Sequence, residues 1–563
     1  MRKNRTFVPK SWDFVFRHYQ WSYLKNDLFA GITVGLVALP LAMAFAIASG
    51  APPERGLYTA IIAGFLISLL GGSRYQIGGP TGAFVVIIFS IIQRHGYDGL
   101  VFTTLAASIL LLIAAFTKLG DWIKYIPYPL VTGFTTGIAV IIFSSQVKDF
   151  LGLNIAYMPA DFIPKWAAIL SSFSTINYAA FGVASGTLIL ILLIRRFTPF
   201  LPWGITSVVI ATFATWFFDL PVETIYSKFG ELKRAFPTLS LPSFSFHAND
   251  WRSFVMDSFT IAFLAGVESL LSAVVADGMG GTKHKSNCEL MAQGIANIAA
   301  VSFGGLPATG AIARTATNVK SGAKTPLSGM IHALTLVLIL LFCAPLVSQI
   351  SLACLSAVLV MIAWNMSEVS HFRRLFKAPI GDISVLLTTF LLTVLVDLTV
   401  AVAIGMILAA FLFMKRVGDI SAVISLSSLQ KQDTTDEETY DLDAIERKEV
   451  PPHTEVYEIA GPFFFGVADS LKNILTNLEQ PPKVFILRLR KVPVIDASGM
   501  HALMDFYLKC KRQGTLLLLS GVSITLMGAL EKFGIVQHIG KHNVFTHIDH
   551  ALHFARQFLN RCT

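Results

Sequence analysis

Residues 78–83 read Gly-Gly-Pro-Thr-Gly-Ala, and residues 305–311 read Gly-Leu-Pro-Ala-Thr-Gly-Ala, each inside an otherwise hydrophobic segment. Glycine and proline break a helix at such a point and leave backbone N–H groups without intrahelical partners. Within a bilayer these groups are tolerated only where they line a cavity or bind a ligand. Two interrupted segments at corresponding places in two halves of a chain are typical of a secondary transporter and indicate its substrate site. The alternative is that glycine and proline merely permit close packing.

The composition is that of a membrane protein. Of the 563 residues, 54% are hydrophobic and only 14% are charged, with a mean hydropathy of +0.63. A soluble globular chain carries about 25% charged residues, so most of this chain is predicted to lie in lipid. The net charge of +9 does not indicate a nucleic-acid partner, because the basic residues gather at the predicted membrane boundaries.

The cysteines do not indicate a metal site or a disulfide framework. They are five in number and scattered, with no Cys-x-x-Cys spacing. We therefore expect neither a metal nor a cofactor. The N-terminal arm, residues 1–27, is basic and aromatic and does not resemble a cleavable signal peptide.

Apolar runs long enough to cross a bilayer, which takes roughly 20 residues, recur along the first 416 residues. With the two interrupted segments near 75–92 and 307–320, they predict a total of fourteen spans. The other predicted crossings are 28–49, 56–72, 99–117, 122–143, 177–194, 205–218, 256–277, 286–302, 326–347, 351–366, 380–396 and 398–414.

An even number of spans places both termini on the same side of the membrane. Most lysines and arginines of the span-connecting loops fall on that side, together with the basic N-terminal arm. By the positive-inside rule, both termini are predicted to be cytoplasmic, in a multi-pass protein of a bacterial inner membrane.

The two halves of the chain are predicted to form an inverted repeat. The Thr-Gly-Ala triplets lie 228 residues apart, and the same offset relates Gly50, after the first span, to Gly278, after the eighth. Seven spans in each half reverse the direction in which the second half enters the membrane. The two interrupted segments would then meet near the midplane with their half-helix N-termini facing one point. Helix N-termini carry partial positive charge and free N–H donors, which suits an anion.

Two ionisable residues lie within predicted spans: Glu268 in the eighth span and Arg314 in the second interrupted segment. Each costs about 2.5–3.5 kcal/mol on insertion scales, so such residues usually face a cavity or each other. We predict that Arg314 supplies positive charge near the anion. Glu268 is predicted to carry a proton, since desolvation favours the protonated form of a carboxyl group. The alternative is a structural ion pair between them. Three aspartates at span ends are expected to be solvated: Asp257, Asp277 and Asp397.

The tail beyond Arg416 differs in composition from the rest. Residues 431–446 are polar and acidic and predict a solvated linker. From about residue 453, strand-like and helix-like segments alternate, which predicts a small α/β domain. No nucleotide-binding or nucleophile motif accompanies them, so we expect a regulatory or interaction domain and not an enzyme.

The assembled motifs resemble those of SulP-type anion permeases, the bacterial relatives of the sulfate and chloride/bicarbonate solute carriers. The tail resembles a STAS domain, named after sulfate transporters and anti-sigma-factor antagonists. The resemblance covers nearly the whole chain, and its most specific segments are residues 38–44, 56–58, 79–81, 268–279 and 313–315.

The resemblance implies a core domain and a gate domain that work as an elevator in a homodimer. It places the anion between the two half-helix N-termini and the first span, with Glu268 coupling transport to a proton or to sodium. The substrate-binding residues implied in this sequence are Leu41, Phe45, Gly79, Thr81, Gly82, Ala83, Thr309, Gly310, Ala311, Ala313 and Arg314.

Two details refine the resemblance. Many family members have glutamine where this chain has Leu41, so a polar substrate contact is lost and the anion is expected to differ. Residues 38–49 and 361–368 are most similar to the bacterial C4-dicarboxylate branch, which favours a succinate-like substrate. In the tail, Ser498 matches a serine that is phosphorylated in anti-sigma antagonists, and the alternative that we favour is that it caps a helix.

The sequence thus predicts an α-helical polytopic membrane protein that imports a small anion with protons. C4-dicarboxylates come first as the substrate, with sulfate or bicarbonate as the alternative. An uncoupled anion channel and a non-transporting sensor are the competing classes, and a cytosolic protein is expected to bind the STAS domain. The predicted domains are an N-terminal arm (1–27), a transmembrane domain (28–416), a linker (417–452) and the STAS domain (453–563).

Overall fold

The computed structural model separates the chain into two compact units, Met1–Ala409 and Ala410–Thr563. Within them the structure describes residues 7–17, 19–155, 158–198, 201–239, 251–420, 422–425, 448–464, 467, 471, 474 and 481–562. The predicted acidic linker at 431–446 lies outside the described residues.

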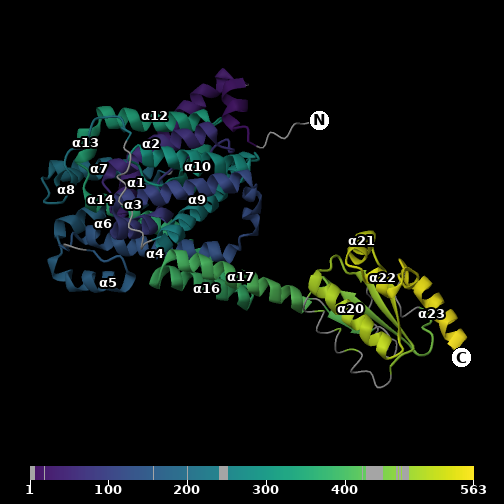
Figure 1. Cartoon of the computed structure of the whole chain (residues 1–563). Helices are drawn as coiled ribbons and strands as arrows, with labels where there is room; N and C mark the ends of the chain where they lie inside the picture. Colours follow the sequence, from purple (N-terminus) through teal and green to yellow (C-terminus); the bar gives the residue numbers. More distant parts are fainter. Residues whose placement is uncertain are drawn as a thin grey trace. The chain divides into compact units, whose positions relative to one another are not determined.

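The first unit is built of helices (Figure 1). Short π- and 3₁₀-helical turns occur at Trp12–Arg17, Trp21–Tyr23, Leu119–Tyr125 and Phe173–Thr175. The α-helices are α1 (Leu24–Ala48), α2 (Pro53–Leu70), α3 (Gly82–Phe116), α4 (Tyr128–Leu151), α5 (Phe162–Ser171), α6 (Tyr178–Phe197), α7 (Trp203–Phe217), α8 (Ile225–Phe229), α9 (Trp251–Gly280), α10 (Ser286–Ser302), α11 (Ile312–Lys320), α12 (Leu327–Phe342), α13 (Ala344–Ser348), α14 (Leu352–Met366), α15 (Val369–Leu375), α16 (Ile380–Leu395) and α17 (Leu398–Ile420).

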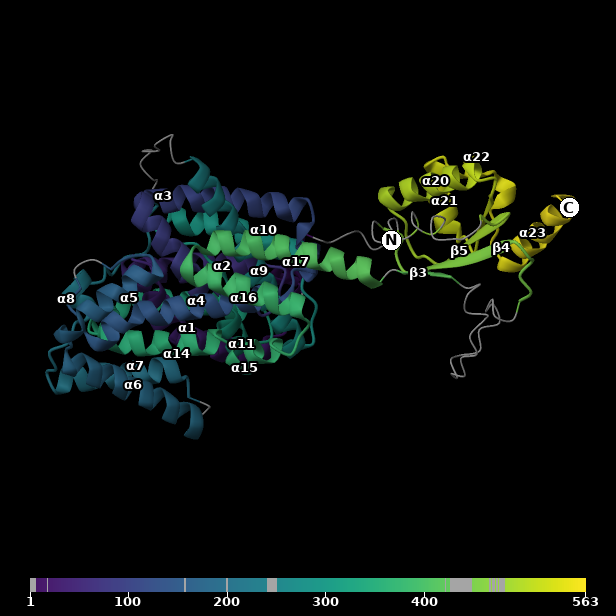
Figure 2. The same ribbon diagram turned by 90° about the horizontal axis from the view of Figure 1, so that it is seen from below.

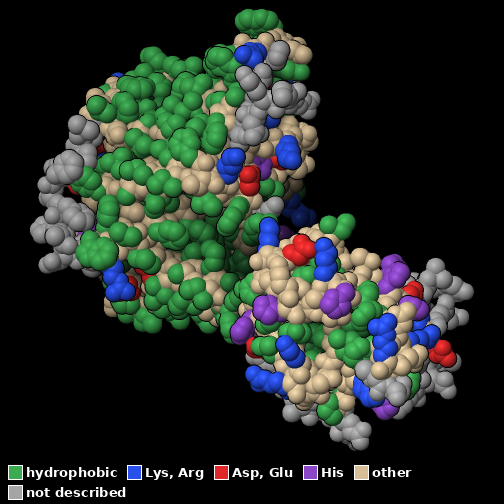
Figure 3. All heavy atoms as spheres, turned by 45° about the vertical axis from the view of Figure 1, so that its right-hand side comes forward, with side chains coloured by type: hydrophobic (Ala, Val, Ile, Leu, Met, Phe, Trp, Pro, Cys, Tyr) green, Lys and Arg blue, Asp and Glu red, His purple; other side chains and the backbone are tan. Residues whose placement is uncertain are grey.

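By length and composition, eight helical segments of the described chain are long and apolar enough to cross a membrane, and four shorter apolar helices accompany them. Hydrophobic side chains cover most of the visible face of the helical unit (Figure 3). On α6 and α7, large side chains such as Leu192, Phe213 and Trp216 are exposed. An exposed apolar face of this extent fits lipid and not water.

The helices pack as two groups. In the first, α3 packs against α9 and α10, and α2 packs against α1, α10 and α12. In the second, α4 packs against α14, α16 and α6, and α6 packs beside α7 (Figure 2). Contacts of α3 with α4 and of α1 with α7 and α14 join the groups.

Some elements differ from those that the sequence predicts. The first interrupted segment and the span at 99–117 share the label α3, but Gly96 between them has non-helical dihedral angles (φ 67°, ψ −174°), so α3 consists of two helices that meet at a kink, as the two predicted spans require. The span expected at 122–143 begins later, at Tyr128, because Pro127 precedes the first turn and the residues before it form a 3₁₀ helix. The short helix α5 was not predicted, because its apolar run is too brief to stand out as a span.

The second unit contains a four-stranded sheet of β3 (Ala422–Ser425), β4 (Thr454–Ala460), β5 (Val484–Lys491) and β6 (Leu516–Ser520), in that order. The pair β3–β4 is antiparallel, whereas β4–β5 and β5–β6 are parallel. Successive residues of β5 pack into hydrophobic cores on opposite faces of the sheet. Phe485 and Leu487 belong to one core, and Val484 and Ile486 belong to the other. The helices are α20 (Ala497–Arg512), α21 (Ile524–Lys532), α22 (Ile535–Ile539) and α23 (Ile548–Cys562), with a 3₁₀ turn at Lys541–Asn543 (Figure 2).

The first strand of this sheet lies inside the range 417–452 that the sequence assigned to a linker. Ala422 to Ser425 pair with Ala460 to Tyr457 of β4. A strand of four residues followed by a long acidic segment gives no periodic signal of its own, so only the pairing reveals it.

Candidate functional site

The two interrupted segments meet in the structure. Before α3, Gly78 and Gly79 form the short strand β1, and before α11, Thr309 and Gly310 form β2. The two strands pair antiparallel, with Gly78 opposite Gly310 and Gly79 opposite Thr309. The backbone N–H of Ala311 also donates to the carbonyl of Ile77, at 2.8 Å. This bridge brings the N-termini of α3 and α11 to the same place.

The Thr-Gly-Ala triplets that drew attention to these segments are not equivalent in space. Thr81 immediately precedes the first residue of α3, whereas Thr309 lies in β2 and α11 begins only at Ile312. Likewise, the glycine with positive φ that follows α9 is Gly281, so it is Gly281 and not Gly278 that matches Gly50 after α1. The offset of 228 residues is therefore wrong by a few residues, although it identified the correct segments.

Both helix N-termini lack a side-chain cap. Thr81, in the N-cap position of α3, and Ala311, in that of α11, make no capping hydrogen bond with their side chains. The first N–H groups of a helix have no intrahelical acceptor, and they carry the positive end of the helix dipole. Two such ends at one bridge form a site with the donors and the charge that an anion requires.

Glu268 lies halfway along α9 and faces the start of α3. Its Oε2 accepts a hydrogen bond from Thr81 Oγ1 at 2.8 Å. One turn earlier on the same helix, the carbonyl of Ala265 accepts a hydrogen bond from Thr309 Oγ1 at 2.9 Å. The threonines of both interrupted segments are thus fixed to α9, and Glu268 is held next to an uncapped helix end.

Arg314 crosses from one interrupted segment to the other. Its Nη2 donates to the carbonyl of Pro80, and its side chain is only 1% exposed. Nη1 has no hydrogen-bond partner among the described residues. A Cβ added to Gly79 would lie 2.5 Å from Nη1, so any larger residue there would displace the guanidinium. The predicted alternative, an ion pair with Glu268, does not form within the described structure, because Glu268 bonds to Thr81 and Arg314 to Pro80.

The remaining predicted residues divide into buried and exposed groups. Leu41 and Phe45 are each 6% exposed on α1, beyond the helix-internal Pro40. Gly82, Ala83 and Ala311 are buried, but Ala313 is exposed and so does not point into the same buried region.

A contact from the second helix group reaches the start of α3. A Cβ added to Gly82 would lie 2.7 Å from Met366 Sδ and 3.3 Å from Ile142 Cδ1. Met366 ends α14 and Ile142 belongs to α4. The half-helix site therefore lies where the two helix groups touch.

The prediction missed a network of buried polar side chains behind the bridge. Gln76 donates to Ser269 Oγ at 2.8 Å, and Thr315 Oγ1 accepts from the N–H of Ile77 at 3.1 Å and from Ser272 at 3.0 Å. Buried polar groups are retained where they satisfy backbone that a broken helix leaves unpaired. A partial signal was present, because Glu268, Ser269 and Ser272 are polar residues within an otherwise apolar stretch of α9.

Two buried carboxylates were also missed. Asp27 on α1 accepts from the N–H groups of Lys324 and Thr325, at 2.6 and 3.0 Å. Glu289 on α10 accepts from the N–H groups of Gly72 and Ser73, at 2.9 and 3.1 Å. Both carboxylates are fully buried, and each fixes a loop from the other half of the chain.

In the second unit, Ser498 is not a helix cap. The N-cap of α20 is Asp496, whose side chain accepts from the N–H of Gly499 at 2.8 Å. Ser498 is an exposed residue of the first turn. The preference for a capping role was therefore wrong, because Asp496, two residues earlier, is the better acceptor.

Comparison with known proteins places this geometry in a family. Residues 24–389 match the model of the sulfate permease family, and residues 445–551 match that of the STAS domain. The chain belongs to the sulfate permease family. It is therefore a multi-pass membrane transporter with a C-terminal STAS domain, in a family of transporters and not of enzymes.

Relatives over nearly the full length carry the names of anion transporters. The chain is 41% identical to a Bacillus subtilis protein named "Putative sulfate transporter YvdB", over 95% of this chain and 98% of that one. It is 31% identical to the bicarbonate transporter BicA of Synechocystis, over 94% of each chain.

Solved structures share the fold. The murine anion transporter Solute Carrier 26 family member A9, described in its inward-facing state, matches with a TM-score of 0.86 and 17% identity, over 99% of this chain and 96% of that one. The transmembrane domain of a cyanobacterial BicA matches with a TM-score of 0.63 and 29% identity, over 68% of this chain and 98% of that one. The C4-dicarboxylate branch finds no counterpart among these relatives.

Proposed function

We propose that this permease carries a small oxyanion, which binds between the N-termini of α3 and α11, and that Glu268 couples its transport to protons. The observation that carries the proposal is the β1–β2 bridge, which brings two uncapped helix ends together. Arg314 adds a buried positive charge to this site, and the buried side chains of Leu41 and Phe45 on α1 would form its apolar wall, as the sequence predicts. Backbone N–H groups bind the charge of an anion without requiring a particular shape.

We rank sulfate and bicarbonate above a C4-dicarboxylate as the substrate. The names of the full-length relatives support this order, since they specify sulfate and bicarbonate. The site itself offers no second side-chain cation beside Arg314 among the described residues of the bridge, which a dicarboxylate would use for its far end. Succinate is included in the uptake assay below, because the sequence predicted a C4-dicarboxylate as the substrate.

The finer architecture is part of the same proposal. We expect fourteen spans in two inverted halves, cytoplasmic termini in a bacterial inner membrane, and a homodimer that works as an elevator. The two helix groups supply candidates for the moving core and the fixed gate, and their contact at Gly82 and Met366 would be broken and remade during transport. The STAS domain would bind a cytosolic protein, with the exposed Ser498 as a candidate phosphorylation site.

Uptake by the purified protein in liposomes tests the proposal. Radiolabelled sulfate, bicarbonate and succinate are offered with and without an inward pH gradient, and empty liposomes serve as the control. A carrier coupled to protons accumulates its anion only with the gradient. Uptake that never exceeds equilibrium would assign the protein to the uncoupled channels, and binding without uptake would indicate a sensor.

A further inference from the structure

A cavity of about 520 Å³ lies apart from the half-helix site, between the two helix groups. Its walls come from the end of α1, the first part of α3, α4, α5 and the junction of α16 and α17. None of the predicted substrate-binding residues lines it. Val85 and Ile142 do, and they adjoin Ala83 and Gly82 of the central site. The cavity is therefore a separate space that ends beside that site.

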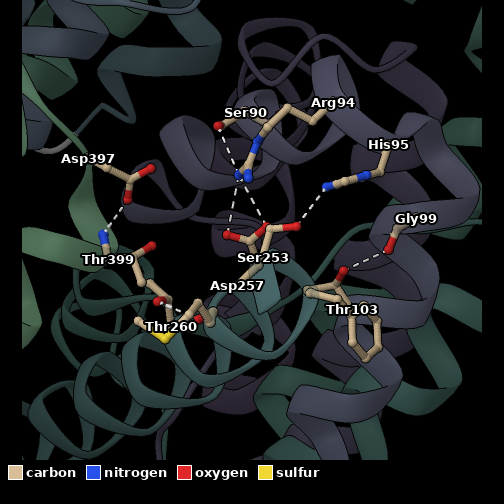
Figure 4. Close-up of polar contacts among 12 residues, drawn as sticks. Ser90, Arg94, His95, Gly99, Thr103, Ser253, Asp257, Thr260, Asp397 and Thr399 are labelled. Carbon is tan, nitrogen blue, oxygen red and sulfur yellow. Dashed lines mark hydrogen bonds and ion pairs between the residues drawn. The ribbon is translucent and has the colours of Figure 1, made fainter. Parts of the chain in front are cut away.

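The cavity contains four basic and four acidic side chains, and most of the basic ones are already engaged. Arg94 of α3 forms an ion pair of 3.1 Å with Asp257 of α9 (Figure 4). Asp257 is only 3% exposed, so the expectation that it is solvated was wrong. Lys148 Nζ donates to the carbonyl of Ile155 at 2.5 Å, and Lys228 lies 3.8 Å from an oxygen of Asp149.

Lys165 of α5 differs from these three. It lines the cavity and is 3% exposed, yet within the described residues its ammonium makes no hydrogen bond and no ion pair. The ammonium lies over the ring of Phe89, whose centroid is 5.7 Å from Nζ. Asp161, one turn earlier on the chain, lines the same cavity; its exposed carboxylate acts on Lys165 electrostatically but forms no ion pair with it within 4 Å. A buried charge without a direct partner is costly, and a negative ligand in the cavity would offset that cost.

We propose that this cavity is a second anion-binding site, in which Lys165 binds a small inorganic anion over the face of Phe89. The ammonium group provides a point charge and no planar fork, so it selects by charge and size and not by shape. The positive charge of Lys165 would attract anions into a cavity that reaches the half-helix site at Val85 and Ile142.

Bromide locates the site directly, because it scatters anomalously. Crystals of the full-length protein are soaked in sodium bromide, and anomalous difference maps are compared for the wild type, Lys165→Met and Lys233→Met. Lys233 is an exposed lysine outside the cavity and serves as the matched control. We expect a peak beside Lys165 Nζ in the wild type and in Lys233→Met, and none in Lys165→Met. A wild type without this peak, or a peak that survives in Lys165→Met, overturns the proposal.

A titration in detergent provides the second measurement. Lys165→Met should bind bromide about tenfold more weakly than the wild type, or weaker still, because it loses a charge-assisted contact. Lys165→Arg keeps the positive charge and should restore the affinity. Melting temperatures show whether Lys165→Met folds, and we expect no loss because an apolar side chain replaces a buried charge. Equal bromide affinity in the wild type and a folded Lys165→Met would contradict the assignment.

The site is distinguishable from the proposed transport site. In Arg314→Ala, bromide beside Lys165 should persist even if transport fails, because Arg314 does not line the cavity. If the protein proves not to transport any anion, the bromide peak still decides whether the second site exists.

Discussion

Thr81 donates a hydrogen bond of 2.8 Å to Glu268, so the carboxylate in the middle of α9 is fixed to the N-cap residue of α3. A proton gained or lost at Glu268 would therefore act on the N-cap residue of the proposed anion site. Such a connection is one way to couple proton and anion, provided that protonation of Glu268 stabilises the two states of the site to different extents.

Glu268→Gln should abolish accumulation driven by a pH gradient while anion exchange persists. The amide oxygen still accepts from Thr81, so the geometry is kept, but the amide cannot carry a proton. Uptake and counterflow are measured in liposomes with and without the gradient. Thr81→Val, which removes the hydrogen bond but keeps the carboxyl group, is the matched variant. A Glu268→Gln protein that still responds to the gradient would disprove the coupling role.

Arg314→Ala should weaken anion binding by about 1.5–3 kcal/mol, which is the range for a charge-assisted hydrogen bond. Arg314→Lys keeps the charge without the contact to Pro80, so it should recover part of the affinity. Isothermal titration of the purified protein gives the dissociation constants. Unchanged dissociation constants in a folded Arg314→Ala would mean that the arginine only stabilises the contact between the two interrupted segments and does not bind the anion.

Gly310→Ala should disrupt the bridge, because the new Cβ would lie 1.9 Å from Gln76 Nε2 and 3.1 Å from Ser269 Cα. Overpacking of a filled interior costs about 1–3 kcal/mol. We expect a lower melting temperature together with loss of anion binding. Gly278→Ala in α9 is the control, since its Cβ would meet nothing within 4 Å. Equal melting temperatures for the two variants would show that the bridge tolerates displacement.

A chain that ends after Ile420 should still bind its anion. The bridge, Glu268 and Arg314 all lie in the unit Met1–Ala409, and the cut follows the last residue of α17. Binding is measured in detergent on monodisperse protein, with the full-length chain as the reference. A well-folded truncation that binds no anion would show that the STAS domain belongs to the transport machinery.

The thiol of Cys510 in the STAS domain should resist alkylation at neutral pH. Its side chain is fully buried in α20, and burial raises its pKa to about 12. Because the folded pKa exceeds the ordinary value of 9.0, the stability from this group is present below pH 9.0 and falls as the pH rises towards 12. Mass spectrometry after maleimide treatment compares native with denatured protein. Equal labelling of Cys510 in the two samples would contradict its burial.

The fold class was predictable because span length and hydropathy depend on local composition. The interrupted segments were predictable for the same reason, since glycine and proline act on their own turn of helix. Which residues of the two halves are equivalent was not predictable from the sequence. The Thr-Gly-Ala triplets match as letters, but Thr81 is the N-cap residue of α3 whereas Thr309 lies in the strand β2. Likewise, nothing local shows that Asp27 bonds to Thr325, or that Asp257 pairs with Arg94, because those partners come from distant segments.

The reciprocal contacts of Asp27 and Glu289 have a consequence for biogenesis. Each carboxylate satisfies backbone N–H groups of a loop that belongs to the opposite half of the chain, and the bridge pairs Gly79 with Thr309 in the same way. During synthesis, the first half therefore enters the membrane before its bonding partners exist. The ribosome has to complete β2 before Gly78 and Gly79 can pair, so the proposed binding site assembles late in synthesis. A nascent chain arrested before residue 309 should consequently be inserted in the membrane yet unable to hold an anion.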